Sequence, residues 1–358
     1  MAYPMFSDEN ASGYSARDAL GSGATDRVRV DFDMIDKVAE IGIVNFPGAQ
    51  MAAVLGMTDL FMTAEQLARR GGEPSEGPRL RVSRWEWLSG DASPVRVFDT
   101  APDSEGSPDV LVLPPALGEP VRREDAVLYA EWLRDRYASG TALGSICKGA
   151  FLLGETGLLS GRTVTTHWTY EEEFQTRFPQ VLVDVDRLVI DDGDILTAGG
   201  VMAWTDLALR LVDRFLGSAA MLETARALLI DPPGREQSYY SAFSPRLNHG
   251  DASILKVQRW MEEWNARSFD LAALVEQSGL EERTFLRRFQ KATGLTTTEY
   301  VQRLRVSRAS KLLQKGDLTG EQVAWEVGYT DPGAFRKVFT RIVGLTPADY
   351  RKRFRMYP

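Results

Sequence analysis

The sequence predicts an α/β domain, with a mostly parallel sheet and helices on both faces, followed by an all-α domain. Short β-branched runs alternate with amphipathic stretches over residues 37–230, a pattern typical of parallel sheets. After the polar stretch 231–252, apolar residues recur at spacings of three and four. Residues 253–358 carry 19 basic and 12 acidic side chains, a net of +7, whereas the rest carries 23 and 38, a net of −15. A basic module on an acidic body indicates either a nucleic-acid-binding end or a solvated basic face.

The elements of the first domain follow from the residue pattern. Strands are expected at 39–45, 79–88, 109–113, 141–146 and 162–166, and helices at 50–70, 121–137, 148–156, 201–216 and 219–230. Residues 181–190 and 194–197 are predicted to form a hairpin around Asp192-Gly193. Residues 1–36 are rich in Ser, Gly, Ala and Asp, and are predicted to form a mobile tail.

The second domain is predicted to contain seven short helices, at 254–265, 271–277, 282–292, 297–313, 320–327, 332–342 and 347–354. Glycines follow several of these segments, and glycine tolerates the left-handed conformation that ends many helices. Thr296 and Thr346 are expected N-caps, because their hydroxyls can accept bonds from free amides of the first turn. Pro332 and Pro347 suit the first helical turn.

Composition and cysteine usage exclude several classes of protein. Apolar residues make up 44% and charged residues 26% of the chain, as in ordinary globular proteins. We find no run of about 18 apolar residues and no basic-then-apolar N-terminus, so we expect no membrane span, no export signal and a cytoplasmic location. The single cysteine, Cys147, cannot form an intramolecular disulfide, and the two histidines, His167 and His249, offer no zinc cluster. We therefore expect no metal and no cofactor.

The second domain contains an internal repeat. Residues 271–289 and 323–339 each read as a helix, a glycine turn and a second helix. The second helix of each copy carries two phenylalanines four residues apart with two cations between them: Phe285 and Phe289 with Arg287 and Arg288, then Phe335 and Phe339 with Arg336 and Lys337. A helix that buries aromatic side chains and projects cations from its other side is typical of the recognition helix in a helix-turn-helix. A helical bundle with a charged face is the alternative.

This region resembles the DNA-binding domain of the AraC/XylS family of transcription regulators over essentially its full length. Residues 328–339 and 344–351 look very close to the family signature. In that family a long linking helix, here 297–313, lets both recognition helices enter neighbouring major grooves, about 34 Å apart on B-DNA.

The resemblance implies which residues face DNA. It places three side chains of the first unit toward base edges: Arg283, Leu286 and Arg287. Arginine can bind guanine through two hydrogen bonds. The corresponding positions of the second unit include Pro332 and Gly333, which have no side-chain donors. We therefore expect the second unit to contact mainly phosphates, through Arg336, Lys337 and backbone amides.

Cys147 lies in Gly144-Ser-Ile-Cys-Lys-Gly149, between a predicted strand and a predicted helix. A nucleophile elbow needs small residues on both sides of the nucleophile, and the following helix N-terminus stabilises a thiolate. His167 follows at the end of another predicted strand, and strand ends on one edge of a parallel sheet converge. The alternative is a buried small hydrophobic residue and a satisfied core histidine.

Residues 37–216 resemble the PfpI-type domain of the class I glutamine amidotransferase-like fold, which has a flavodoxin-like sheet. The matching pieces are the Cys147 elbow, Thr165-Thr-His-Trp168, and Thr197-Ala-Gly-Gly200. Active members use a carboxylate where this chain has Gln50, and backbone amides where it has Pro114 and Pro115, which have none. Lys148 replaces the usual small or hydroxyl neighbour. We therefore expect the chemistry to be lost, with Cys147 and His167 as vestiges, and the pocket to be retained.

A PfpI-type domain fused to an AraC-type domain is the arrangement of the GlxA-like branch of these regulators. The resemblance implies a sequence-specific transcription regulator with a tail at 1–36, a ligand-sensing domain at 37–230, a linker at 231–252 and a DNA-binding domain at 253–358. It implies a homodimer formed by the sensing domain, operator DNA and RNA polymerase as partners, and an amino acid or amine as effector. The expected ligand contacts are Cys147, Lys148, His167 and Trp168. Trp168 is included because a tryptophan can supply a cation–π face to an amine.

Two further hypotheses stay open from the sequence. The first domain can be a cysteine-dependent enzyme, a hydratase or amidase, that is tethered to a DNA-binding module. That hypothesis needs an acid near Cys147, and Asp59 is the nearest candidate in sequence. A redox sensor that oxidises Cys147 to a sulfenic acid is the other.

Overall fold

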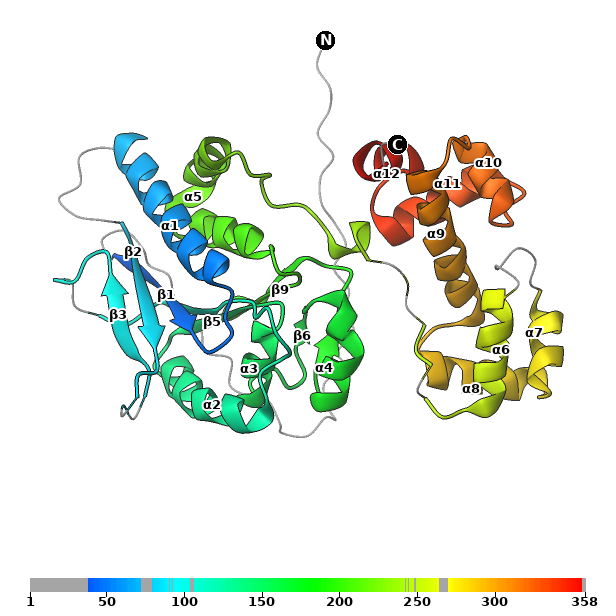
Figure 1. Cartoon of the computed structure of the whole chain (residues 1–358), viewed down its shortest axis with the longest axis horizontal. Helices are drawn as coiled ribbons and strands as arrows, with labels where there is room; N and C mark the ends of the chain where they lie inside the picture. Colours follow the sequence, from blue (N-terminus) through cyan, green and yellow to red (C-terminus); the bar gives the residue numbers. More distant parts are fainter. Residues whose placement is uncertain are drawn as a thin grey trace, which may run out of the picture.

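A computed structural model describes residues 38–355, except 72–78, 90, 92, 104, 105, 242, 244, 248 and 264–269. The predicted tail, 1–36, lies outside these residues. The described chain forms an α/β part and an all-α part, which lie side by side in Figure 1. The predicted fold class is confirmed.

The α/β part is built on a seven-stranded sheet in the order β3-β2-β1-β4-β5-β9-β8. Five central strands run parallel: β2 (Leu80–Glu86), β1 (Ala39–Asn45), β4 (Val110–Leu113), β5 (Ala142–Ile146) and β9 (Ile195–Ala198). The edge strands β3 (Val95–Asp99) and β8 (Val189–Asp191) are antiparallel to their neighbours. The predicted hairpin is therefore confirmed as β8 and β9, and β3 is a strand that the sequence analysis missed.

Helices cover both faces of the sheet, as Figure 1 shows. One face packs against α1 (Met51–Gly71) and α5 (Trp204–Leu228), and the other against α2 (Arg123–Ala138) and α3 (Gly149–Glu155). The two helices predicted over 201–230 are both present, because α5 is divided into two helices at Gly217, whose φ of 85° suits glycine.

The prediction for residues 162–190 was wrong in part. The segment predicted as a strand at 162–166 does not join the main sheet, because β6 (Thr163–Val164) pairs with β7 (Leu182–Val183) in a separate two-stranded sheet. The strand predicted at 181–190 is two short strands, β7 and β8. Between β6 and β7 lie two unpredicted helical turns, η1 (Trp168–Tyr170) and α4 (Glu171–Arg177).

The all-α part contains the seven predicted helices: α6 (Ala252–Glu263), α7 (Leu271–Ser278), α8 (Glu282–Thr293), α9 (Thr297–Lys315), α10 (Gly320–Glu326), α11 (Pro332–Val343) and α12 (Pro347–Phe354). The hydroxyls of Thr296 and Thr346 cap α9 and α12, as predicted. Gly279, Gly294 and Gly344 end α7, α8 and α11 in the left-handed conformation.

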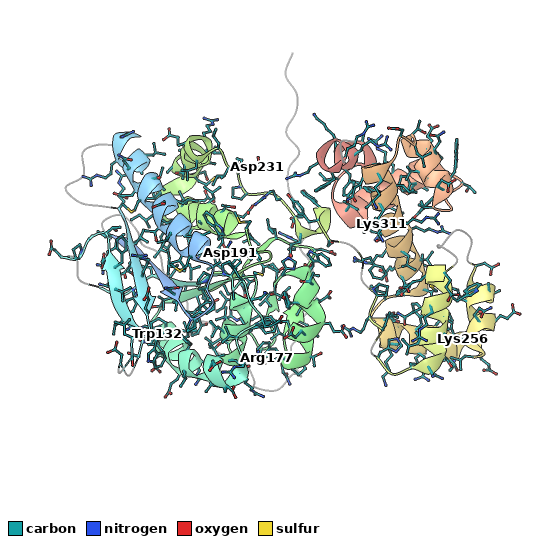
Figure 2. The ribbon with its side chains drawn as sticks, viewed as in Figure 1. Trp132, Arg177, Asp191, Asp231, Lys256 and Lys311 are labelled. Atoms are coloured by element: carbon teal, nitrogen blue, oxygen red, sulfur yellow. The ribbon has the colours of Figure 1, made fainter. Side chains whose placement is uncertain are left out.

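The repeat forms two units with separate cores, joined by α9. In Figure 2 Lys256 lies on α6 in one unit and Lys311 on the α9 segment that enters the other. Phe289 meets Tyr300 edge-on at 5.2 Å between ring centroids, and Phe339 meets Tyr350 at 5.5 Å. All four rings are buried. The same aromatic pair thus holds each recognition helix in place.

Candidate functional site

The exposed face of α8 carries the three side chains expected to read bases. Arg283, Leu286 and Arg287 are exposed, while Phe285 and Phe289 on the opposite side are buried. Neither Arg283 nor Arg287 has an ion-pair partner within the described part of the chain. Their guanidinium groups are therefore free to donate hydrogen bonds to a ligand.

Arg288, which was expected to project outward beside Arg287, is half-buried and forms an ion pair. Its Nε and Nη2 atoms donate to the two carboxylate oxygens of Asp251, at 2.8 and 2.7 Å. The Arg288 guanidinium holds the pKa of Asp251 below its usual range. Asp251 precedes α6, so this pair joins α8 to the first helix of its own unit.

The exposed face of α11 carries the two cations that are expected to contact phosphates. Arg336 and Lys337 are exposed, and among the described residues they have no ion-pair partner. The carboxylate of Asp331 accepts bonds from the amides of Gly333 and Ala334, at 2.8 and 3.1 Å. These two amides are therefore bonded within the N-terminal turn of α11.

One residue of the α8 surface was missed by the sequence analysis. Gln290 is exposed, three residues after Arg287 and seven after Arg283, so it lies on the same helix face. Glutamine can bind adenine through two hydrogen bonds. The spacing from Arg283 was the signal that could have identified it.

Cys147 lies in the strained turn that a nucleophile elbow requires. Its φ is 54°, and Leu229 is the other non-glycine residue with a positive φ in the described chain. Its amide donates to the Ala198 carbonyl at 2.7 Å, which ties the turn to the end of β9. A β-carbon on Gly149 would lie 2.6 Å from the Leu113 carbonyl oxygen, which explains the small residue two places after the cysteine.

The thiol of Cys147 is fully buried. Burial raises its pKa, although the amides of Lys148 and Gly200 and the charge of Lys148 act in the opposite direction. No carboxylate of the described residues is among the groups that act on it. The sulfur is therefore held as a neutral thiol, the form that is a poor nucleophile.

His167 and Trp168 lie beside this turn even though β6 is outside the main sheet. Thr166 connects them to it, because its hydroxyl donates to the Cys147 carbonyl at 2.8 Å. The Nδ1 atom of His167 accepts a bond from the Thr169 amide at 3.2 Å. Burial lowers the pKa of His167, and the charge of Lys148 lowers it further, so the ring is neutral. Trp168 stacks on it, with 5.7 Å between ring centroids.

Lys148 is a buried cation without a carboxylate partner among the described residues. The side chain is 6% exposed. Its ammonium group donates to the carbonyls of Leu117 and Gly118, and lies 4.9 Å from the centroid of the Tyr170 ring. A charge buried in this way attracts an anionic group.

The position of the family's acid holds Gln50, as the sequence indicated. Gln50 is 8% exposed, and its side-chain oxygen has no hydrogen-bond partner in the described structure. The backbone N–H of Gln50 donates to the Pro115 carbonyl at 2.7 Å, so the loop before α1 contacts the segment that follows β4. Asp59, the other candidate acid, lies on the exposed side of α1. The hydroxyl of Ser145, two residues before the cysteine, is also buried without a partner.

Comparisons with known proteins identify both parts. The profile of the DJ-1/PfpI family matches residues 95–214, and that of a helix-turn-helix domain matches residues 274–353. The chain is 28% identical to the HTH-type transcriptional regulator GlxA of Rhizobium meliloti, over 70% of this chain and 78% of that protein. It is 27% identical to the HTH-type transcriptional regulator CdhR of Pseudomonas aeruginosa, over 75% of this chain and 81% of that protein.

An enzyme is also among the similar proteins. The chain is 33% identical to the isonitrile hydratase of Pseudomonas putida, over 30% of this chain and 46% of the hydratase. The two similar regulators, by contrast, align with both parts of the chain.

Among the described residues, the structure contains no helix with the length and hydropathy that a membrane span requires. The chain belongs to the AraC-type helix-turn-helix transcription regulators that carry a DJ-1/PfpI domain, the GlxA-like branch.

Proposed function

We propose that residues 37–230 form a non-catalytic sensor and that the free cations of α8 and α11 bind the operator. The observation that carries the sensor proposal is the chemistry around Cys147. A cysteine nucleophile needs a lowered thiol pKa and a proton carrier. Here burial raises the thiol pKa, His167 has its Nδ1 atom bonded to its own helical turn, and glutamine stands at the acid position.

We propose that the effector carries a carboxylate. Lys148 supplies a buried positive charge, and no described carboxylate offsets it. Gln50 and Ser145 offer further polar atoms without partners. An amino acid fits this set, whereas an amine without an acidic group would face the repulsion of Lys148. Trp168 is half-buried against His167, which makes the cation–π role less favourable than the anion site.

Replacing Lys148 with methionine is expected to raise the pKa of His167, because the lysine charge disfavours the imidazolium. The measurement is an NMR titration of the two histidine rings, with His249, which precedes α6, as the reference signal. Because desolvation by burial remains, the midpoint should move toward the ordinary value without exceeding it. An unchanged midpoint would show that the ammonium does not act on this site.

Replacing Cys147 with alanine is expected to leave DNA affinity in the absence of effector within about threefold of wild type. The thiol is buried in the α/β part and takes no part in the α8 or α11 surface. Fluorescence anisotropy with an operator duplex provides the measurement. Loss of DNA binding would show that the cysteine holds the fold together instead.

The similarity to isonitrile hydratase supports one second candidate, an enzyme that uses Cys147. Incubation of the purified chain with an aliphatic isonitrile, followed by detection of the N-substituted formamide, tests it. We expect no turnover above that of the Cys147→Ala variant. Turnover that depends on Cys147 would replace the sensor proposal by the enzyme.

The remaining partners follow from the regulator's architecture. We propose that the chain acts as a homodimer through its α/β part, contacts RNA polymerase at its operator, and works in the cytoplasm, the compartment that holds the DNA. Sedimentation of the full chain at several concentrations tests the dimer, and a monomer at all of them would contradict it.

A further inference from the structure

The segment that follows the α/β part carries a buried amide side chain. Asp231, labelled in Figure 2, lies where the chain leaves α5, and the short helix η2 (Gln237–Tyr239) follows. Gln237 is 2% exposed. Its Nε2 atom donates to the Thr165 hydroxyl and the Thr166 carbonyl at 2.9 Å each, and its Oε1 atom accepts from the Trp168 amide at 3.2 Å. Four polar groups of the α/β part meet it, since Nε2 also lies 3.0 Å from the Arg187 carbonyl.

These contacts place Gln237 beside the elbow that holds Cys147. A β-carbon on Gly199 would lie 2.0 Å from the Gln237 Nε2 atom, so the missing side chain is what admits the amide. Gly199 stands between Ala198, whose carbonyl accepts the Cys147 amide, and Gly200, whose amide acts on the thiol. Gln237 therefore contacts both segments that hold the Cys147 turn. One contains Thr166, whose hydroxyl donates to the Cys147 carbonyl, and the other contains Gly199.

The next residues of the segment hold the end of the second recognition helix. The hydroxyl of Ser238, 9% exposed, donates to the carbonyl of Val343, the last residue of α11, at 3.0 Å. Tyr239 packs where a β-carbon on Gly344 would lie, 2.5 Å from its ring. Tyr240 meets Phe354 of α12 edge-on at 5.4 Å. Two adjacent residues thus join the Cys147 turn to α11.

We propose that Gln237 is the positioning residue that couples the Cys147 site to the second DNA-binding unit through Ser238. The inference rests on the proposed sensor function. A ligand beside His167 and Trp168 acts on the segment that bonds Gln237, and any shift of Gln237 moves Ser238 and the end of α11. Such coupling is reciprocal in the binding free energies, so DNA bound to the second unit must change the effector affinity of the Cys147 site by the factor by which the effector changes DNA affinity.

Because the chain has a single cysteine, the coupling between DNA binding and the Cys147 site can be measured without knowing the effector. The full chain is treated with iodoacetamide, with and without a saturating DNA duplex selected from genomic fragments, and the alkylation rate of Cys147 is followed by mass spectrometry. We expect DNA to change the rate at least about fivefold in wild type, because alkylation of the fully buried thiol requires local opening of the turn that Gln237 helps to hold. In Gln237→Ala and Ser238→Ala the ratio of the two rates should fall below twofold, while DNA affinity stays within about fivefold of wild type.

The ratio separates coupling from simple destabilisation. A merely structural role of Gln237 would change both rates together and leave the ratio intact. Gln175→Ala is the matched control, because Gln175 also donates to a backbone carbonyl, that of Val181, but within the α/β part. It should keep the wild-type ratio. Amide hydrogen exchange of Trp168, whose N–H bonds Gln237, gives the same comparison if the buried thiol reacts too slowly.

Two results would overturn the inference: a wild-type ratio below twofold by both methods, or a wild-type ratio retained in Gln237→Ala. Absence of any DNA duplex bound by wild type is a different outcome, because it removes the regulator function itself.

Discussion

Arg287→Ala is expected to weaken operator binding by about 1–3 kcal/mol and to relax sequence preference at a single base position. Arg287 is exposed, free of ion pairs within the described chain, and held by a helix whose opposite face is buried through Phe285 and Phe289. Selection of binding sites from a randomised duplex, followed by affinity measurements on the best sequence and its point variants, measures both effects.

The neighbouring arginine provides the matched control. Arg288 differs from Arg287 by one position, but its guanidinium is bonded to Asp251. Arg288→Ala should therefore leave the selected sequence unchanged and affect only how firmly α8 is held against α6. If both variants lose sequence preference at the same base position, the assignment of base contact to Arg287 and of a structural role to Arg288 is wrong.

Lys337→Ala should behave differently from Arg287→Ala. Lys337 lies on α11, where the two N-terminal amides are bonded to Asp331 and the first residues lack side-chain donors. We expect a loss that is similar for all sequences, and a decrease of about one in the slope of log affinity against log salt. A base-specific loss would show that α11 also reads sequence.

Phe339→Ala is expected to destabilise the second unit by about 3–5 kcal/mol. Phe339 is fully buried, and it contacts Phe335 at 5.6 Å and Tyr350 at 5.5 Å between ring centroids. Removal of the ring leaves a cavity in the core and also removes the edge-on contact with Tyr350. Denaturant unfolding combined with amide exchange measures the loss and locates it.

The repeat supplies the comparison for this variant. Phe289→Ala should destabilise the first unit by a similar amount, because Phe289 makes the equivalent contact with Tyr300. Each variant should reduce amide protection in its own unit, since the two cores are separate clusters. Leu286→Ala, on the exposed side of α8, should leave stability within about 0.5 kcal/mol. Equal loss of protection in both units after either variant would show a single cooperative core.

The all-α part could be predicted almost completely from the sequence. Its helices are local structures with apolar residues every three or four positions, and their ends carry Thr caps and left-handed glycines. The α/β part was predicted less well. Strand partners lie far apart in the sequence, so the pattern of 162–166 could indicate a strand but not that it pairs with β7 outside the main sheet.

The candidate site shows the same division. The elbow around Cys147 and the exposed stripe of α8 follow from local sequence, and the resemblance to the PfpI-type domain implies that Gln50 replaces the acid. The pairing of Arg288 with Asp251 and the bonds of Gln237 join residues 37 or more positions apart, and nothing local specifies which carbonyl an amide or guanidinium meets. A polar side chain in a predicted linker is expected to be solvated, and only the structure shows that Gln237 is buried.

The central claim, sequence-specific operator binding, is tested most directly by recovering genomic DNA fragments with the purified full chain at two salt concentrations. We predict a small set of fragments that share a two-part motif, its halves separated by about one helical turn, and that remain enriched at the higher salt. Recovery of fragments without a common motif, all lost at the higher salt, would contradict the claim.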